Sequence, residues 1–249
     1  MISGPPPDYV SRPDGTRLAY RLTPGRGPAL IFFPGYRSDM QGSKAIALEA
    51  WAVRTGHPFL RFDYSGCGES DGAFEDETLQ TWLADALCII EHVLSGPVIL
   101  IGSSMGGWLA VHAARALGGA AKGLVGIAAA PDFTDWGFTD AEKHILRDRG
   151  RLERPSDYSD EPMVTTDALW QSGAGLRVLG SPIALACPVR LIQGQCDRDV
   201  PWKTALQLAE DLCSADVQVI LVKDGDHRLS RDQDIALLTR IVSDLLECL

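Results

Sequence analysis

The chain has no block of basic residues, no long apolar run and no closely spaced pair of cysteines. Its 23 lysines and arginines are outnumbered by 33 acidic residues, which gives a formal net charge of −10. An acidic chain without a basic patch binds nucleic acid and anionic membrane surfaces poorly, so we expect neither partner. The longest apolar runs fall far short of the roughly 20 residues that cross a bilayer, so no membrane span is expected.

The N-terminus lacks the basic and apolar stretches of a secretion signal, and it lacks the arginine-rich character of an organelle presequence. The six cysteines are dispersed, as is typical of reduced thiols, and we predict a cytoplasmic location. Most of them are expected to be small core or surface residues, with a redox role left open for Cys67 and Cys196. Histidines, cysteines and acidic residues show no metal-ligand spacing, so we expect no metal and no cofactor.

The sequence does contain a regular alternation of short apolar runs and amphipathic helical segments. Strands are predicted at 16–22, 29–33, 58–64, 98–101, 122–130, 189–193 and 217–222, and helices at 43–55, 78–94, 105–114, 202–213 and 232–249. Strands that alternate with helices of this length predict an α/β fold with a mostly parallel central sheet flanked by helices. With 249 residues, of which 45% are hydrophobic, the chain suits a single domain over 1–249.

The alternation stops between residues 131 and 182. This stretch contains scattered aromatic residues, a charged helical piece at 139–151, a proline-rich part at 154–162 and a second possible helix at 164–173. A segment of this length without an apolar pattern would form a poor core, and long insertions in compact domains often cover a site. We predict a lid inserted after the sixth strand. Trp136 and Trp170 are candidate pocket residues, and packing of both within the lid itself is the alternative.

A Gly-x-Ser-x-Gly sequence joins the predicted strand at 98–101 to the helix that follows it. Gly102 and Gly106 flank Ser104, which would stand at the apex of a sharp strand–turn–helix connection. Small residues are needed at both flanking positions because the chain approaches itself closely there. The turn would expose the Ser104 hydroxyl as a nucleophile and place the Met105 amide at the helix N-terminus, where it can stabilise an oxyanion. A glycine-rich turn without chemistry is the alternative.

A serine nucleophile needs a histidine base, and the base needs a carboxylate that orients it. His227 is the candidate base because it lies in a tight loop after the last predicted strand, at the carboxyl edge of the sheet. The loop after the preceding strand supplies two candidate acids, Asp197 and Asp199. Asp197 lies closer to the strand end and is preferred, whereas Asp199 suits a capping role at the next helix. The Tyr36 amide, in the loop after strand 29–33, is the candidate second oxyanion donor.

These stretches, in this order and spacing, resemble the α/β-hydrolase family over nearly the whole chain. The matching segments are 33–36, 63–70, 102–106, 194–201 and 225–227. The resemblance implies that Ser104 is the nucleophile, His227 the base and Asp197, four residues before Pro201, the acid. It also implies that the amides of Tyr36 and Met105 form the oxyanion hole.

A narrower similarity, at 33–45, 62–72 and 102–108, is to a branch of palmitoyl-protein thioesterases that also cleave acyl glucuronides, found in mitochondria and bacteria. It implies hydrolysis of esters or acyl thioesters, with a small-molecule substrate or an acylated protein. The expected function is therefore a serine hydrolase that works through an acyl-enzyme. A serine peptidase or amidase, and a non-catalytic ligand-binding member of the fold, are the alternatives.

Overall fold

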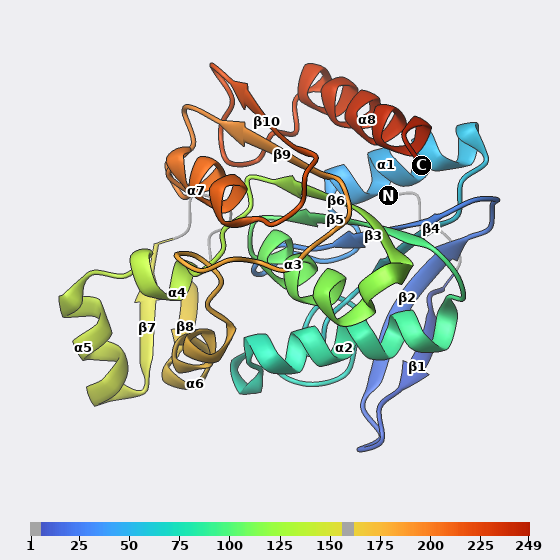
Figure 1. Cartoon of the computed structure of the whole chain (residues 1–249). Coiled ribbons are helices and arrows are strands. Elements are labelled where there is room, and N and C mark those ends of the chain that lie inside the picture. Colours follow the sequence, from blue (N-terminus) through green and yellow to red (C-terminus); the bar gives the residue numbers. More distant parts are fainter. Residues whose placement is uncertain (1–5, 156–161) are drawn as a thin grey trace.

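The computed structural model describes residues 6–155 and 162–249, and its centre is one eight-stranded sheet (Figure 1). The strand order is β1-β2-β4-β3-β5-β6-β9-β10. The strands are β1 (Asp8–Ser11), β2 (Arg17–Thr23), β3 (Ala29–Phe33), β4 (Phe59–Phe62), β5 (Val98–Ser103), β6 (Ala121–Ile127), β9 (Val189–Gly194) and β10 (Val217–Val222). β1 and β2 pair antiparallel, as do β2 and β4, whereas all other neighbours are parallel. The predicted mostly parallel sheet is confirmed.

Helices cover both faces of this sheet. The longer ones are α1 (Ser43–Thr55), α2 (Leu79–Val93), α3 (Met105–Leu117), α7 (Lys203–Asp211) and α8 (Asp232–Glu247), with short turns η1 (Phe74–Asp76) and η2 (Gly118–Ala120). In Figure 1, α1 and α8 lie together on one side of the sheet, and α2 and α3 lie on the other. All five were predicted from the helical spacing of apolar residues, and their ends lie within a few residues of the predicted ones.

Strand β3 shows why the apolar runs are continuous. Ile31 and Phe33 belong to the core shared with α2 and α3, whereas Leu30 and Phe32 belong to the core shared with α1 and α8. Successive side chains of a strand point to opposite faces, so a strand covered on both faces needs apolar residues at every position. This arrangement leaves the carboxyl ends of the parallel strands as the open edge, where the loops that follow them can form a site.

The residues between β6 and β9 form a separate layer, which we call the lobe (131–182). It contains α4 (Phe133–Trp136), α5 (Asp140–Arg149), β7 (Arg151–Arg154), β8 (Met163–Thr166), α6 (Asp167–Ser172) and η3 (Gly173–Leu176), and it projects beside the sheet in Figure 1. β7 and β8 pair as an antiparallel hairpin that was not predicted, and the helix predicted at 164–173 begins only at Asp167, after β8. Their four-residue sequences are too short and too polar to show the alternation by which strands are recognised. Part of the predicted proline-rich stretch, 156–161, lies outside the described residues.

One side of the lobe is held to the body by hydrogen bonds to α2 and α3. The Trp108 indole N–H donates to the Leu176 carbonyl over 2.8 Å, and the Ser172 hydroxyl accepts from the Leu79 amide over 3.1 Å. The bonds to α2 and α3 give the α6 and η3 end of the lobe a defined position against the body. Within the lobe, the Asp132 carboxylate accepts from the amides of Val178 and Leu179 and so joins its two ends. Within the described ranges, no helix is both long enough and apolar enough to cross a membrane.

Candidate active site

Ser104 lies at the apex of the turn between β5 and α3, with backbone angles φ 54° and ψ −123°. A positive φ is unusual for a residue with a side chain, and it is retained here because the surroundings leave no room for relaxation. A Cβ added at Gly102 would collide with the Gly106 carbonyl, and one added at Gly106 would collide with the Phe33 carbonyl. The close approach inferred from the two glycines is therefore present, and it leaves the Ser104 hydroxyl facing the open edge of the sheet.

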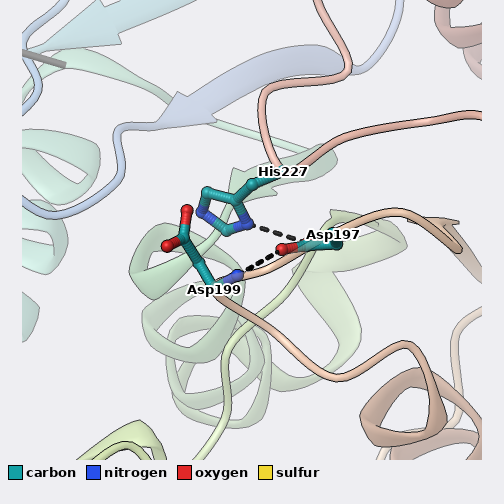
Figure 2. Close-up of side chains that lie close together, drawn as sticks. All are labelled: Asp197, Asp199 and His227. Atoms are coloured by element: carbon teal, nitrogen blue, oxygen red, sulfur yellow. Dashed lines mark hydrogen bonds and ion pairs between the residues drawn. The ribbon is translucent and has the colours of Figure 1, made fainter. Parts of the chain in front are cut away.

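Two loops complete the site around this hydroxyl. His227, in the loop after β10, places Nε2 3.1 Å from Ser104 Oγ. Its Nδ1 lies 2.9 Å from Oδ2 of Asp197, in the loop after β9 (Figure 2). Because a carboxylate only accepts, Nδ1 carries the proton and Nε2 is left as the acceptor for the Ser104 hydroxyl. The residues selected from the sequence as nucleophile, base and preferred acid thus form one hydrogen-bonded chain. The strand order β5-β6-β9-β10 brings together loops that are far apart in the sequence.

Asp197 is held more firmly than the sequence indicates. Its side chain is fully buried, and each oxygen accepts two hydrogen bonds: Oδ2 from His227 and the Gln193 amide, and Oδ1 from the backbone N–H groups of Asp199 and Val200. Burial alone would raise the pKa of this carboxyl, but the hydrogen bonds from His227 and the two backbone amides outweigh it and lower the pKa. The group is therefore a stable carboxylate beside the imidazole at neutral pH.

Asp199 lies next to this chain rather than within it. Figure 2 shows its carboxylate on the other side of the His227 ring from Asp197, and only its backbone N–H bonds to Asp197. One ligand atom from each of Asp197, Asp199 and His227 lies within 4.8 Å of the others, which is the spacing of a possible cation site. Both Asp197 oxygens are already engaged by hydrogen-bond donors, so this set fits a carboxylate–imidazole pair better than a metal centre.

The two predicted oxyanion donors, the amides of Tyr36 and Met105, belong to segments that adjoin Ser104. Met105 is the first residue of α3 and follows Ser104 directly. Gly35 passes so close to the serine that a Cβ added there would lie 3.4 Å from the Ser104 Cβ, and Tyr36 is the next residue of that loop. No described residue accepts a hydrogen bond from the amide of Tyr36 or Met105. Unpaired amides at this position are suited to binding an oxyanion.

The glycine-rich loop 65–72 is hydrogen-bonded, through Asp63, to the segment that follows Tyr36. Asp63, just before it, accepts from the Met40 amide over 2.7 Å and from the Glu69 amide over 2.8 Å, so it ties this loop to the chain after Tyr36. Burial raises the pKa of Asp63 to about 6. Burial also raises the pKa of Cys67 to about 12, so this thiol is neutral and poorly nucleophilic at physiological pH. The redox role left open for Cys67 is thereby disfavoured.

A cavity of about 560 Å³ opens between Ser104, His227 and the lobe. Its lobe side is lined by Phe133, Trp136, Gly137, Phe138, Arg154, Met163 and Thr165, and its sheet side includes Arg37, Lys44, Arg198, Asp199 and Arg228. The predicted pocket residue Trp136 lies in this wall. Trp170 is not among the lining residues: it packs against the small apolar core of the lobe, and its indole N–H donates to the Thr134 carbonyl over 2.7 Å.

Several residues of the site were not selected from the sequence. Gln193 donates a hydrogen bond to the Asp197 carboxylate. It is a polar residue near the carboxyl end of the buried strand β9, and that position could have marked it as a site residue. Lys44 donates to the Arg228 carbonyl next to His227, and burial lowers its pKa to about 8. Met163 lines the cavity from β8, a strand that the sequence pattern did not reveal.

Comparison with known proteins gives a consistent result. The family model for the alpha/beta hydrolase family matches residues 30–238. The bovine palmitoyl-protein thioesterase ABHD10, named as mitochondrial, is 42% identical over 243 residues, which cover 96% of this chain and 79% of the relative. The solved structure of mouse alpha/beta hydrolase domain-containing protein 10 matches with a TM-score of 0.91 at 40% identity, covering 97% of this chain and 98% of that one. A putative hydrolase from Agrobacterium vitis S4 matches with a TM-score of 0.90 at 39% identity, covering 96% and 97%.

These findings correct the predicted location and confirm the predicted family. The predicted cytoplasmic location is contradicted, because the similar curated proteins from five mammals are all named as mitochondrial. The prediction depended on the composition of the first residues, and a chain's beginning is weak evidence of where it functions. The resemblance in sequence motifs is confirmed over most of the chain. The protein belongs to the alpha/beta hydrolase family, and it is a hydrolase of the type that these thioesterase relatives represent.

Proposed function

We propose that this protein is a serine hydrolase that cleaves acyl thioesters or carboxylic esters through Ser104, His227 and Asp197. The observation that carries the proposal is the hydrogen-bonded chain from Ser104 Oγ through the imidazole to the buried Asp197 carboxylate. The lowered pKa of Asp197 keeps this group as the carboxylate that its role requires. The unpaired amides of Tyr36 and Met105 add support, because they lie beside the serine.

The reaction proceeds in two halves. In the first, Ser104 Oγ attacks the acyl carbonyl while His227 Nε2 takes the hydroxyl proton, and Asp197 stabilises the resulting imidazolium. The carbonyl oxygen becomes an oxyanion held by the Tyr36 and Met105 amides. His227 then returns its proton to the departing thiol or alcohol, and the acyl group remains on Ser104. In the second half, water gives a proton to His227 and attacks the acyl-enzyme, and the acid is released as Ser104 regains its proton.

We further propose that the chain is a single domain in which the lobe acts as the lid over the acyl group. Aromatic and thioether side chains, namely Phe133, Trp136, Phe138 and Met163, line the lobe side of the cavity, and such a surface suits an apolar acyl chain. The mammalian relatives are named palmitoyl-protein thioesterases, which supports an acyl thioester of a small molecule or of a protein as the substrate.

The test is hydrolysis of paired substrates by the wild type and by Ser104→Ala. We expect the wild type to release the acid from 4-nitrophenyl esters and from acyl thioesters, and to be labelled covalently by a fluorophosphonate probe at Ser104. The variant should lose labelling and lose at least about 10³-fold in turnover, because the acyl-enzyme cannot form. Faster cleavage of matched 4-nitroanilides than of esters would instead favour the amidase alternative. A folded wild type inert toward all three classes would favour a ligand-binding role.

A further inference from the structure

Tyr36 takes part both in the loop beside Ser104 and in the contact with the lobe. Its backbone amide is the proposed oxyanion donor, whereas its side chain crosses to β8, where the hydroxyl donates a 2.6 Å hydrogen bond to the Val164 carbonyl. Its neighbour Arg37 donates to the Pro162 carbonyl over 3.2 Å. The loop that carries the oxyanion amide is thereby bonded to the β7–β8 hairpin through consecutive residues.

The phenol ring of Tyr36 is fixed from several sides. Phe74, Trp82 and Phe133 pack against it with ring centroids 5.2, 6.0 and 6.1 Å away. Burial raises the pKa of the phenol to about 12, so the hydroxyl keeps its proton and remains a donor at neutral pH. These three ring contacts restrain the phenol, so we expect a displacement of its hydroxyl to move the Tyr36 backbone.

The accepting carbonyl belongs to Val164, which lies between two residues of β8 that line the cavity. Met163 and Thr165 line the cavity, and Val164 between them is buried on the other face of β8, as strand alternation requires. An acyl chain that fills the lobe side of the cavity therefore contacts the same strand segment that holds the Tyr36 hydroxyl. Other anchors of the lobe do not involve this loop: Ser172 and Leu176 bond to α2 and α3, and Arg151 of β7 pairs with Glu75 of η1 over 3.5 Å.

We propose that the Tyr36 hydroxyl is a positioning group that couples occupancy of the lobe by the acyl chain to the placement of the oxyanion amide. The inference rests on the proposed function. Acyl groups long enough to contact Met163 then order β8, and through Tyr36 they hold the loop amide where the oxyanion develops. Binding energy from a remote part of the substrate is thus expressed in kcat rather than in KM. Short acyl groups, which do not reach the lobe, gain nothing from the contact.

The experiment measures kcat and KM for 4-nitrophenyl esters from acetate to decanoate with the wild type and Tyr36→Phe. For the wild type we expect kcat to rise with chain length. For Tyr36→Phe we expect kcat to fall about tenfold on decanoate and less than about twofold on acetate, as the loss of one buried hydrogen bond allows. The matched control is Tyr64→Phe, since the Tyr64 hydroxyl donates to the Pro34 carbonyl of the same loop over 3.4 Å rather than to β8. Its effect should be the same factor at every chain length.

A second variant, Met163→Ala, shortens the side chain through which the acyl group would act on β8. It should remove the rise of kcat with chain length by itself, and it should add little to Tyr36→Phe in the double variant, because both interrupt one coupling. It also provides the test if Tyr36→Phe proves unstable. Equal losses at all chain lengths, losses confined to KM, or additive effects in the double variant would overturn the inference. The proposed function fails on separate results: no turnover of esters and thioesters by the wild type, or turnover that does not depend on Ser104.

Discussion

Replacement of Asp197 by asparagine is expected to abolish most of the activity while leaving the fold in place. The asparagine side chain is isosteric with aspartate, but it keeps only one oxygen as an acceptor. In the native site Oδ1 accepts from the backbone N–H groups of Asp199 and Val200, and Oδ2 accepts from Gln193 and His227. The single asparagine oxygen will take the Oδ1 position, where two backbone donors would otherwise be left buried and unpaired.

The new NH2 group then faces His227 Nδ1 at the Oδ2 position. It can only donate, so the imidazole must present a bare Nδ1 and carry its proton on Nε2. That tautomer cannot accept the proton of Ser104. The same exchange in a serine protease triad lowers kcat by about 10⁴-fold, which corresponds to about 5.5 kcal/mol in the activation free energy. We expect a loss of about 10³- to 10⁴-fold here, with little change in KM, because the substrate cavity is untouched.

The assay is steady-state hydrolysis of a 4-nitrophenyl ester between pH 6 and 9, with circular dichroism to verify the fold. Asp199→Asn is the matched control, since it removes an equal charge next to the same imidazole without changing the tautomer. We expect it to change kcat by less than about tenfold. The reasoning is refuted if Asp197→Asn keeps more than a tenth of wild-type kcat, or if Asp199→Asn is the more damaging variant.

Three further outcomes follow from the structure. Gly68→Ala should destabilise the fold by about 1–3 kcal/mol in urea unfolding, because Gly68 has φ 51° and an added Cβ would strike the Asp63 carboxylate; an unchanged midpoint would contradict this. In the native protein at pH 8, mass spectrometry should find Cys196, which is exposed, alkylated by iodoacetamide well before Cys67, whose raised pKa keeps it protonated. Burial lowers the pKa of Lys44 to about 8 in the folded protein, against 10.5 for a free lysine. Between these pH values the unfolded chain keeps the Lys44 proton and the folded chain has lost it, so the free energy of unfolding should rise with pH. Urea unfolding of Lys44→Met should lack this rise.

The sheet and its flanking helices were predictable because their signals are local. Continuous apolar runs identify strands covered on both faces, and helical spacing identifies α1, α2, α3, α7 and α8. The lobe was predicted less well. β7 and β8 are short and polar, and their pairing is antiparallel and isolated from the main sheet, so nothing in their sequences separates them from loops. Trp136 and Trp170 look alike in the sequence, and only packing places one in the cavity wall and the other in the core of the lobe.

The sequence by itself determined the turn at Ser104 and the order of the chemical groups along the chain, because Gly102 and Gly106 act on their immediate neighbours. Tertiary structure decided which groups meet. The bond between His227 and Ser104 spans 123 positions, and the bond between Tyr36 and Val164 spans 128. It also decided that Asp197 rather than Asp199 accepts from the imidazole. Such contacts depend on strand order and on the packing of the lobe, and these arise from the summed burial of many side chains rather than from any local pattern.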